Sequence, residues 1–186
     1  MRLIASGAPV RMANQGQNTS TGNLNLSRVR VLVVDDNDFA REFITAALKS
    51  LCIREIINAE HGAKALDLIK SHMPDLVLVD WMMEPVNGLE LVRELRAHEN
   101  RSLRFLPIIM VSAYSELWRV HNVRDAGANE FVVKPFSAKT LYAKIRAIVD
   151  NPRPFIDVPS GFFGPDRRRR SIPVADDKRQ ARARIG

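Results

Sequence analysis

The sequence predicts an α/β fold in which a five-stranded parallel sheet is covered by helices on both faces. Two features predict it. Runs of four to six aliphatic residues are typical of strands that are buried on both faces. These runs alternate five times with longer stretches in which apolar residues recur about every 3.6 positions, as in helices that pack along one side. Repeated βα units of this kind indicate a doubly wound sheet.

Four of the predicted strands run directly into polar residues. Ligands of open α/β sheets bind at the carboxyl ends of the strands, so these polar side chains should converge on one crevice. That crevice would contain three carboxylates, a hydroxyl and an ammonium group. The runs, in chain order, are VRVLVV before Asp35 and Asp36, DLVLV before Asp80, LPIIMV before Ser112, and EFVV before Lys134 and Pro135.

Five helices are expected between and after the strands. The last shows the pattern clearly, with apolar Leu141, Ile145 and Ile148. Five βα units favour the flavodoxin-like strand order 2-1-3-4-5, and right-handed crossovers then place the ends of the first and third strands side by side. The expected helices span residues 38–50, 61–71, 87–98, 115–126 and 137–150.

The predicted crevice has the composition of a phosphoryl site. Crowded carboxylates require a cation, and oxygen ligands favour Mg²⁺, so Asp35, Asp36 and Asp80 indicate a magnesium site. The ammonium group of Lys134 would neutralise a phosphoryl group, and the hydroxyl of Ser112 can donate a hydrogen bond to it. Asp80 is the natural nucleophile, because a carboxylate can accept a phosphoryl group and form an acyl phosphate.

The order Asp-Asp, Asp, Ser, Lys-Pro at successive strand ends resembles the CheY-like receiver domain of bacterial two-component response regulators. From Asp35 to Asp80, to Ser112 and to Lys134, the spacings of 45, 32 and 22 positions agree with this family. The resemblance covers roughly Arg28 to Asn151. Three further segments match it: Ala59 through Leu66, Asp80 through Gly88, and Asp125 through Ala128.

The resemblance implies a role for each site residue. Asp80 would be the phosphoacceptor, and Mg²⁺ would be held by Asp35, Asp36, Asp80 and the backbone carbonyl of Met82. Ser112 and Lys134 would bind the phosphoryl group, Ser112 and Phe131 would form the conformational switch, and the bond before Pro135 would be cis. Met82 and Tyr114 would border the path of the hydrolytic water.

Two positions depart from the family's pattern. Glu84 stands where the acceptor loop often has proline, and Pro85 follows one place later. Phe131 stands where the family often has tyrosine, so a switch side chain here would lack the hydroxyl group and its hydrogen bond.

The resemblance also implies a function. The chain would be a cytoplasmic, bacterial phosphoprotein that takes a phosphoryl group from a histidine kinase or a histidine phosphotransfer protein in a Mg²⁺-dependent step. It would not be an enzyme with a separate substrate. Its output would be phosphorylation-dependent contact with a downstream protein target, and a homodimer through 115–126, 130–133 and 137–150 is one arrangement that the family suggests.

Two other functions fit parts of the sequence. Asp36-Asn37-Asp38 after a strand also resembles the haloacid-dehalogenase-like phosphatases, but the next acidic pair is Asp176-Asp177, far outside any strand. The second alternative is binding of nucleic acid or another polyanion through the basic C-terminal segment FFGPDRRRR. Nucleic-acid binding is the less favoured interpretation, because the prolines of this segment exclude a helix-turn-helix.

Charge and composition divide the chain into three parts: an unstructured N-terminal tail 1–27, a receiver domain 28–151, and a mostly irregular, basic C-terminal tail 152–186. Residues 29–150 carry 16 basic and 17 acidic residues, so the net charge of +7 comes from outside them. Apolar runs fall short of the roughly 20 residues of a membrane span, and the single cysteine, Cys52, excludes an internal disulfide. Both Met1 and Met12 are compatible with the start of translation.

Overall fold

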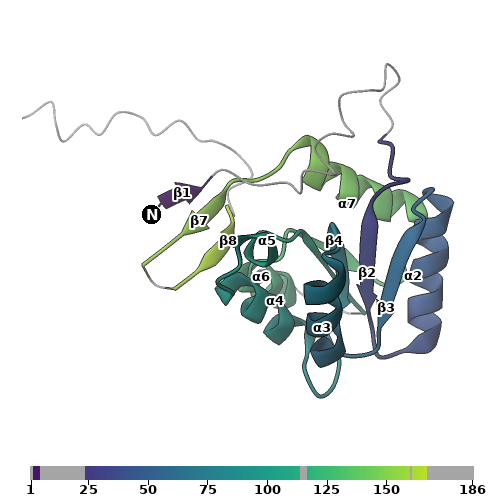
Figure 1. Cartoon of the computed structure of the whole chain (residues 1–186), viewed down its shortest axis with the longest axis horizontal. Coiled ribbons are helices and arrows are strands. Elements are labelled where there is room, and N and C mark those ends of the chain that lie inside the picture. Colours follow the sequence, from purple (N-terminus) through teal and green to yellow (C-terminus); the bar gives the residue numbers. More distant parts are fainter. Residues whose placement is uncertain (1, 5–23, 114–116, 160, 167–186) are drawn as a thin grey trace, which may run out of the picture.

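The computed structural model describes residues 2–4, 24–113, 117–159 and 161–166. Its centre is a five-stranded parallel sheet with the order β3-β2-β4-β5-β6 (Figure 1). Counted along the chain within this sheet, the order is 2-1-3-4-5, which confirms the predicted flavodoxin-like fold. The strands are β2 (Arg30–Val34), β3 (Glu55–Ala59), β4 (Leu76–Asp80), β5 (Ile108–Ser112) and β6 (Glu130–Val133).

Helices cover both faces of this sheet because side chains alternate along each strand. Val31 and Val33 belong to the apolar cluster beneath the first and last helices of the βα units, whereas Leu32 and Val34 belong to the cluster beneath the other helices. The first face carries α2 (Asp38–Ser50) and α7 (Ala138–Asp150). The second carries α3 (Gly62–His72), α4 (Gly88–Ala97) and α6 (Leu117–Ala126).

The described residues contain six helices, one more than predicted. The additional helix, α5 (Arg101–Arg104), spans only four residues, which is too short to show a periodic apolar pattern. The side chain of Asn100 caps it by accepting a hydrogen bond from the backbone N–H of Ser102. Within the described part of the chain, no helix is long and apolar enough to cross a membrane.

A second, antiparallel sheet joins the two ends of the described chain. It consists of β1 (Arg2–Ile4), β7 (Phe155–Asp157) and β8 (Phe163–Pro165), in the order β1-β7-β8, and Figure 1 shows it beside α5 and α4. These three short strands were not among the elements expected from the sequence, and the division into 1–27, 28–151 and 152–186 stays a prediction. Residues 5–23 and 167–186 lie outside the described residues.

Prolines adjoin both strands of the C-terminal segment. Pro154 directly precedes β7, and Pro165 is the last residue of β8. Because β8 lies at an edge of its sheet, a proline there interrupts no ladder within the sheet. The prolines thus exclude a helix, as predicted, but they do not exclude short strands.

Candidate functional site

Three predicted site residues meet at the carboxyl ends of the strands. The ammonium nitrogen of Lys134 lies 2.5 Å from Oδ2 of Asp35 and 2.6 Å from Oδ1 of Asp80, and it donates a hydrogen bond to each. Both carboxylates are buried, with side-chain exposures of 1% and 9%. One lysine therefore bridges two buried carboxylates that come from residues 99 and 54 positions away in the sequence.

The loop after β2 fixes the position of Asp35. Its backbone N–H continues the β2–β3 ladder by donating to the carbonyl of Ala59, and its Oδ1 accepts a hydrogen bond from the N–H of Asn37 at 3.0 Å. Asn37 in turn caps α2 by accepting from the N–H of Ala40. Strand end, turn and helix start thus hold the carboxylate in the crevice.

The loop after β4 fixes the position of Asp80. Oδ2 of Asp80 accepts a hydrogen bond from the N–H of Met82 at 2.7 Å, and the N–H of Gly88 donates to the carbonyl of Trp81 at 2.9 Å. A Cβ atom on Gly88 would lie only 2.1 Å from the carbonyl oxygen of Asp80, so only glycine allows α4 to begin this close to the acceptor.

The first turn of α4, which begins at Gly88, contains a capping box that was not predicted from the sequence. Asn87 and Glu90 form a capping box, in which the Asn87 side chain accepts from the N–H of Glu90 and the Glu90 side chain accepts from the N–H of Asn87. An N-cap residue followed three places later by glutamate is a recognised sequence signature of a helix start. That signature could have predicted where α4 begins.

Ser112 and Lys134 lie at the ends of neighbouring strands. Ser112 is buried, and its carbonyl oxygen accepts a hydrogen bond from the N–H of Lys134 at 2.7 Å. The Lys134–Pro135 peptide bond is cis, as is the Glu84–Pro85 bond in the acceptor loop. The hydroxyl that the sequence predicts as a phosphoryl ligand thus lies on the strand between those of Asp80 and Lys134.

The electrostatics of the site reflect its burial. Burial raises the pKa of the Asp80 carboxyl, and the nearby Asp35 adds to this effect, while hydrogen bonds and charge from Lys134 act in the opposite direction without cancelling it. For Lys134, burial alone would lower the pKa of the ammonium group, but the two carboxylates outweigh burial and raise it. The lysine is therefore fully charged at neutral pH.

The other two predicted metal ligands lie at the rim of the site. Asp36 is exposed, and so is Met82, the residue whose backbone carbonyl is the predicted ligand, at 55%. Among the residues that the structure describes, no three His, Cys, Asp or Glu side chains are grouped as a metal site. The ammonium group of Lys134 lies between Asp35 and Asp80, so these two carboxylates share one positive charge.

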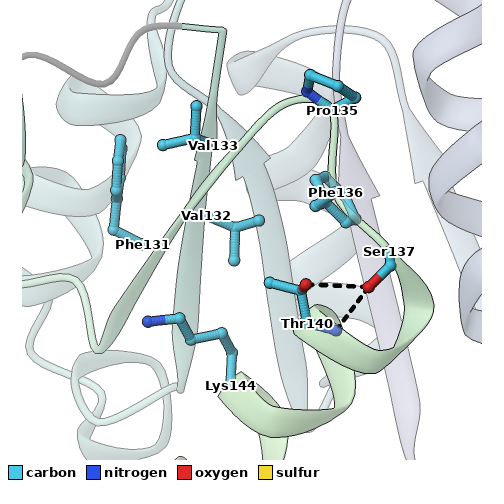
Figure 2. A pocket seen from close by; sticks show the side chains of 8 residues that line it. All are labelled: Phe131, Val132, Val133, Pro135, Phe136, Ser137, Thr140 and Lys144. Atoms are coloured by element: carbon cyan, nitrogen blue, oxygen red, sulfur yellow. Dashed lines mark hydrogen bonds between the residues drawn. The ribbon is translucent and has the colours of Figure 1, made fainter.

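The predicted switch residue Phe131 lies on β6, at the edge of the sheet. It is half-buried and lines an open groove of about 620 Å³ between β6 and α7. Figure 2 shows Phe131 and Val133 on one side of the strand and Val132 on the other, with Lys144 at one end of the groove. Tyr114, which the sequence analysis placed beside the water path, lies outside the described residues.

Comparisons with known proteins agree on the type of domain. Residues 31–146 match the family described as the response regulator receiver domain. The chain is 34% identical over 122 residues to the chemotaxis protein CheY of Pseudomonas aeruginosa, covering 66% of this chain and 97% of that protein. It is 35% identical over 122 residues to a CheY homologue of Campylobacter jejuni, covering 65% of this chain and 92% of that protein.

Solved structures give the same result. A response regulator from Chloroflexus aurantiacus superposes with a TM-score of 0.61 at 26% identity, covering 67% of this chain and all of that one. The receiver domain of the sensor histidine kinase PA1611 from Pseudomonas aeruginosa superposes with a TM-score of 0.60 at 28% identity, covering 66% of this chain and 98% of that one. That structure contains a magnesium ion coordinated in its active-site cleft.

Proposed function

The chain belongs to the response regulator receiver family, and we propose that it accepts a phosphoryl group on Asp80. One observation supports this most directly: the ammonium group of Lys134 lies within hydrogen-bonding distance of both Asp35 and Asp80 in a crevice at the strand ends. A buried carboxylate beside a mobile positive charge is the arrangement that phosphoryl transfer to an aspartate requires.

The transfer would use the residues of the crevice in defined roles. A carboxylate oxygen of Asp80 forms a bond to phosphorus as the bond from phosphorus to the donor breaks, and the donor's imidazole or acyl oxygen leaves with the electron pair. Lys134 then moves from the Asp80 carboxylate to an oxygen of the phosphoryl group, while Asp35 keeps its ammonium group nearby. The hydroxyl of Ser112 donates to another phosphoryl oxygen.

The donor set of the site fits Mg²⁺. Carboxylates of Asp35, Asp36 and Asp80 and the carbonyl of Met82 would hold the ion, and all four are oxygen donors of the kind that Mg²⁺ prefers. The bridging position of Lys134 supports this, because the buried carboxylates already share one positive charge. Bound Mg²⁺ would neutralise charge that develops on the transferring phosphoryl group. The ion in the related PA1611 receiver supports the same assignment.

The proposed donor is a histidine kinase or a histidine phosphotransfer protein. The surface beside the crevice suits a protein donor, because Phe39 and Phe43 on α2 are 83% and 50% exposed. Exposed aromatic side chains of this size are typical of protein contact sites. The downstream partner would be a protein that recognises the phosphorylated form, and the groove beside Phe131 is a candidate contact for it.

The other two functions have less support. Asp36, the nucleophile of a haloacid-dehalogenase-like phosphatase, is exposed, whereas Asp80 is buried beside Lys134. We therefore propose a phosphoacceptor that takes part in its own phosphorylation and dephosphorylation rather than an enzyme with a separate substrate. The arginine run 167–170 lies outside the described residues, so binding of a polyanion stays a prediction from the sequence.

The acceptor assignment is tested with acetyl phosphate and Mg²⁺, followed by intact-mass measurement. The wild type should gain one phosphoryl group, Asp80→Asn should gain none, and Asp36→Ala should lose the dependence on Mg²⁺ because a ligand is missing. Asp38→Asn is a matched control, since Asp38 is an exposed acid in the first turn of α2. Phosphorylation of Asp80→Asn at the wild-type level would disprove the assignment.

A further inference from the structure

The β7–β8 hairpin is attached to the receiver fold by a buried aromatic cluster. Phe155 and Phe163 from the hairpin pack with Phe105, which directly follows α5, and all three are buried. Their ring centroids are 4.8 to 5.3 Å apart. The guanidinium group of Arg104 lies 3.8 Å from the ring centroid of Phe163, and that of Arg96 lies 5.2 Å from the centroid of Phe155.

Arg96 connects this cluster to the turn between α6 and β6. It is 3% exposed, and it donates hydrogen bonds to the carbonyl oxygens of Gly127 and Arg104 and to Oδ1 of Asn129, at 2.9, 2.9 and 3.1 Å. Burial lowers the pKa of its guanidinium group to about 9, so it remains charged at neutral pH. Asn129 also accepts from the N–H of Ile108 at the start of β5.

The hairpin and the α6–β6 turn touch through their backbones. A Cβ atom on Gly164 would lie 2.8 Å from Cα of Gly127, and a Cβ atom on Gly127 would lie 2.9 Å from the carbonyl oxygen of Phe163. Gly127 also has a φ of +99°, which favours glycine. Because no side chain lies between the two backbones, a small displacement of the turn must either move the hairpin or break the contact.

This turn lies between two elements that lead to the phosphoryl site. On one side, α6 precedes Gly127 and follows Ser112 in the chain; on the other, β6 (Glu130–Val133) ends directly before Lys134. A second link exists at Glu130, whose carboxylate lies 3.7 Å from the guanidinium group of Arg153, just before β7. The hairpin is thus in contact with the far ends of the elements that adjoin Ser112 and Lys134.

We propose that the hairpin is a latch that is closed in the unphosphorylated protein and loosened by phosphorylation of Asp80. The docked hairpin fits the arrangement in which Lys134 bridges Asp35 and Asp80. When Lys134 and Ser112 bind a phosphoryl group instead, α6 or β6 is displaced. This displacement weakens the contact between the hairpin and the α6–β6 turn. The loosened hairpin exposes the apolar cluster formed by Phe105, Phe155 and Phe163. This inference rests on the proposed function.

Hydrogen exchange of the full chain tests the latch. The protein is incubated in Mg²⁺ with and without acetyl phosphate, and the phosphorylated fraction is measured by intact mass. Amides of 155–165 should exchange at least about five-fold faster in the phosphorylated protein, the lower end of typical coupling between two sites. Asp80→Asn treated with the same donor should show no change.

The coupling should also act in the opposite direction, because coupling between two sites is reciprocal. A change that loosens the hairpin should therefore favour phosphorylation of Asp80. Gly164→Ala keeps every aromatic side chain but places a methyl group against Gly127, and Phe163→Ala removes a ring from the cluster. Both should raise the phosphorylated fraction at limiting acetyl phosphate. Met73→Ala, which truncates an exposed side chain at the end of α3, should leave it unchanged.

The outcomes separate the two proposals. Failure of the wild type to gain a phosphoryl group would overturn the proposed function and the latch together. Phosphorylation of Asp80 with unchanged exchange in 155–165, or with the same phosphorylated fraction in Gly164→Ala, Phe163→Ala and wild type, would overturn the latch alone.

Discussion

Replacement of Lys134 by methionine should destabilise the protein in a way that depends on pH and Mg²⁺. The change removes the ammonium group that donates a hydrogen bond to both Asp35 and Asp80, at 2.5 and 2.6 Å. Removal of one partner from a buried ion pair costs about 3 to 5 kcal/mol. Because the lysine side chain is 24% exposed, the lower end of this range, about 3 kcal/mol, is expected.

The pH dependence follows from the carboxylates. In the wild type, burial raises the pKa of Asp80 despite the opposing effect of Lys134, and loss of the lysine raises it further. An acid with a raised pKa in the folded state loses stability as pH rises from its unfolded pKa through its folded pKa. The deficit of Lys134→Met should therefore be largest at pH 7 to 8 and shrink toward about pH 4, where aspartates of the unfolded chain become protonated.

Urea unfolding at several pH values, with EDTA or with Mg²⁺, measures these effects. Mg²⁺ should stabilise the variant more than the wild type, because it can supply the missing positive charge. Lys139→Met, an exposed lysine in the first turn of α7, is the matched control and should change stability by less than about 0.5 kcal/mol. A deficit for Lys134→Met that is equal at pH 4.5 and pH 8 would refute the reasoning.

Two further predictions concern the lifetime and the source of the phosphoryl group. Met82→Asn should shorten the lifetime of the phosphorylated protein several-fold, equivalent to about 1 kcal/mol of barrier, because an amide can orient the attacking water where the exposed thioether cannot. The rate at which the phosphorylated protein loses its phosphoryl group in Mg²⁺ checks this, and equal rates for the variant and the wild type would contradict it. Phe39→Ala should slow phosphorylation by a protein donor by about ten-fold, a loss of about 1.4 kcal/mol of contact, while acetyl phosphate reacts at the wild-type rate. Equal losses with both donors would show that Phe39 supports the site itself rather than the contact.

The central sheet could be predicted because the hydrophobic pattern of each segment matches the strand or helix that it forms. Strand β4, for example, is five aliphatic and acidic residues that are all buried, and α2 begins at Asp38 and ends at Ser50 as its apolar pattern predicts. Such buried runs leave little choice of structure. The short α5 was harder to predict, because a helix of one turn has no periodicity to detect.

The convergence of Asp35, Asp80 and Lys134 was predictable for a different reason. The topology of a doubly wound sheet brings these strand ends together, whatever the distance between them in the sequence. The bridging position of the ammonium nitrogen was not predictable, because it depends on the balance between burial of the two carboxylates and attraction to one cation. Sequence spacing contains no information on that balance.

The hairpin could not be predicted because nothing within its own sequence stabilises it. Its strands are three residues each, and a two-stranded hairpin alone is marginally stable at best in water. It is held by contacts with distant segments: β1 pairs with β7, and Phe105, Arg96 and Arg104 pack against the hairpin's phenylalanines from about fifty to sixty residues earlier in the chain. Gly127 in the α6–β6 turn and Gly164 in β8 also form the two sides of one backbone contact, which the sequence alone does not reveal. A short segment that folds only against the receiver depends on the exact position of the surface beneath it. That dependence is the physical reason for the proposal that a displacement of this surface by phosphorylation of Asp80 also changes how firmly the hairpin is held.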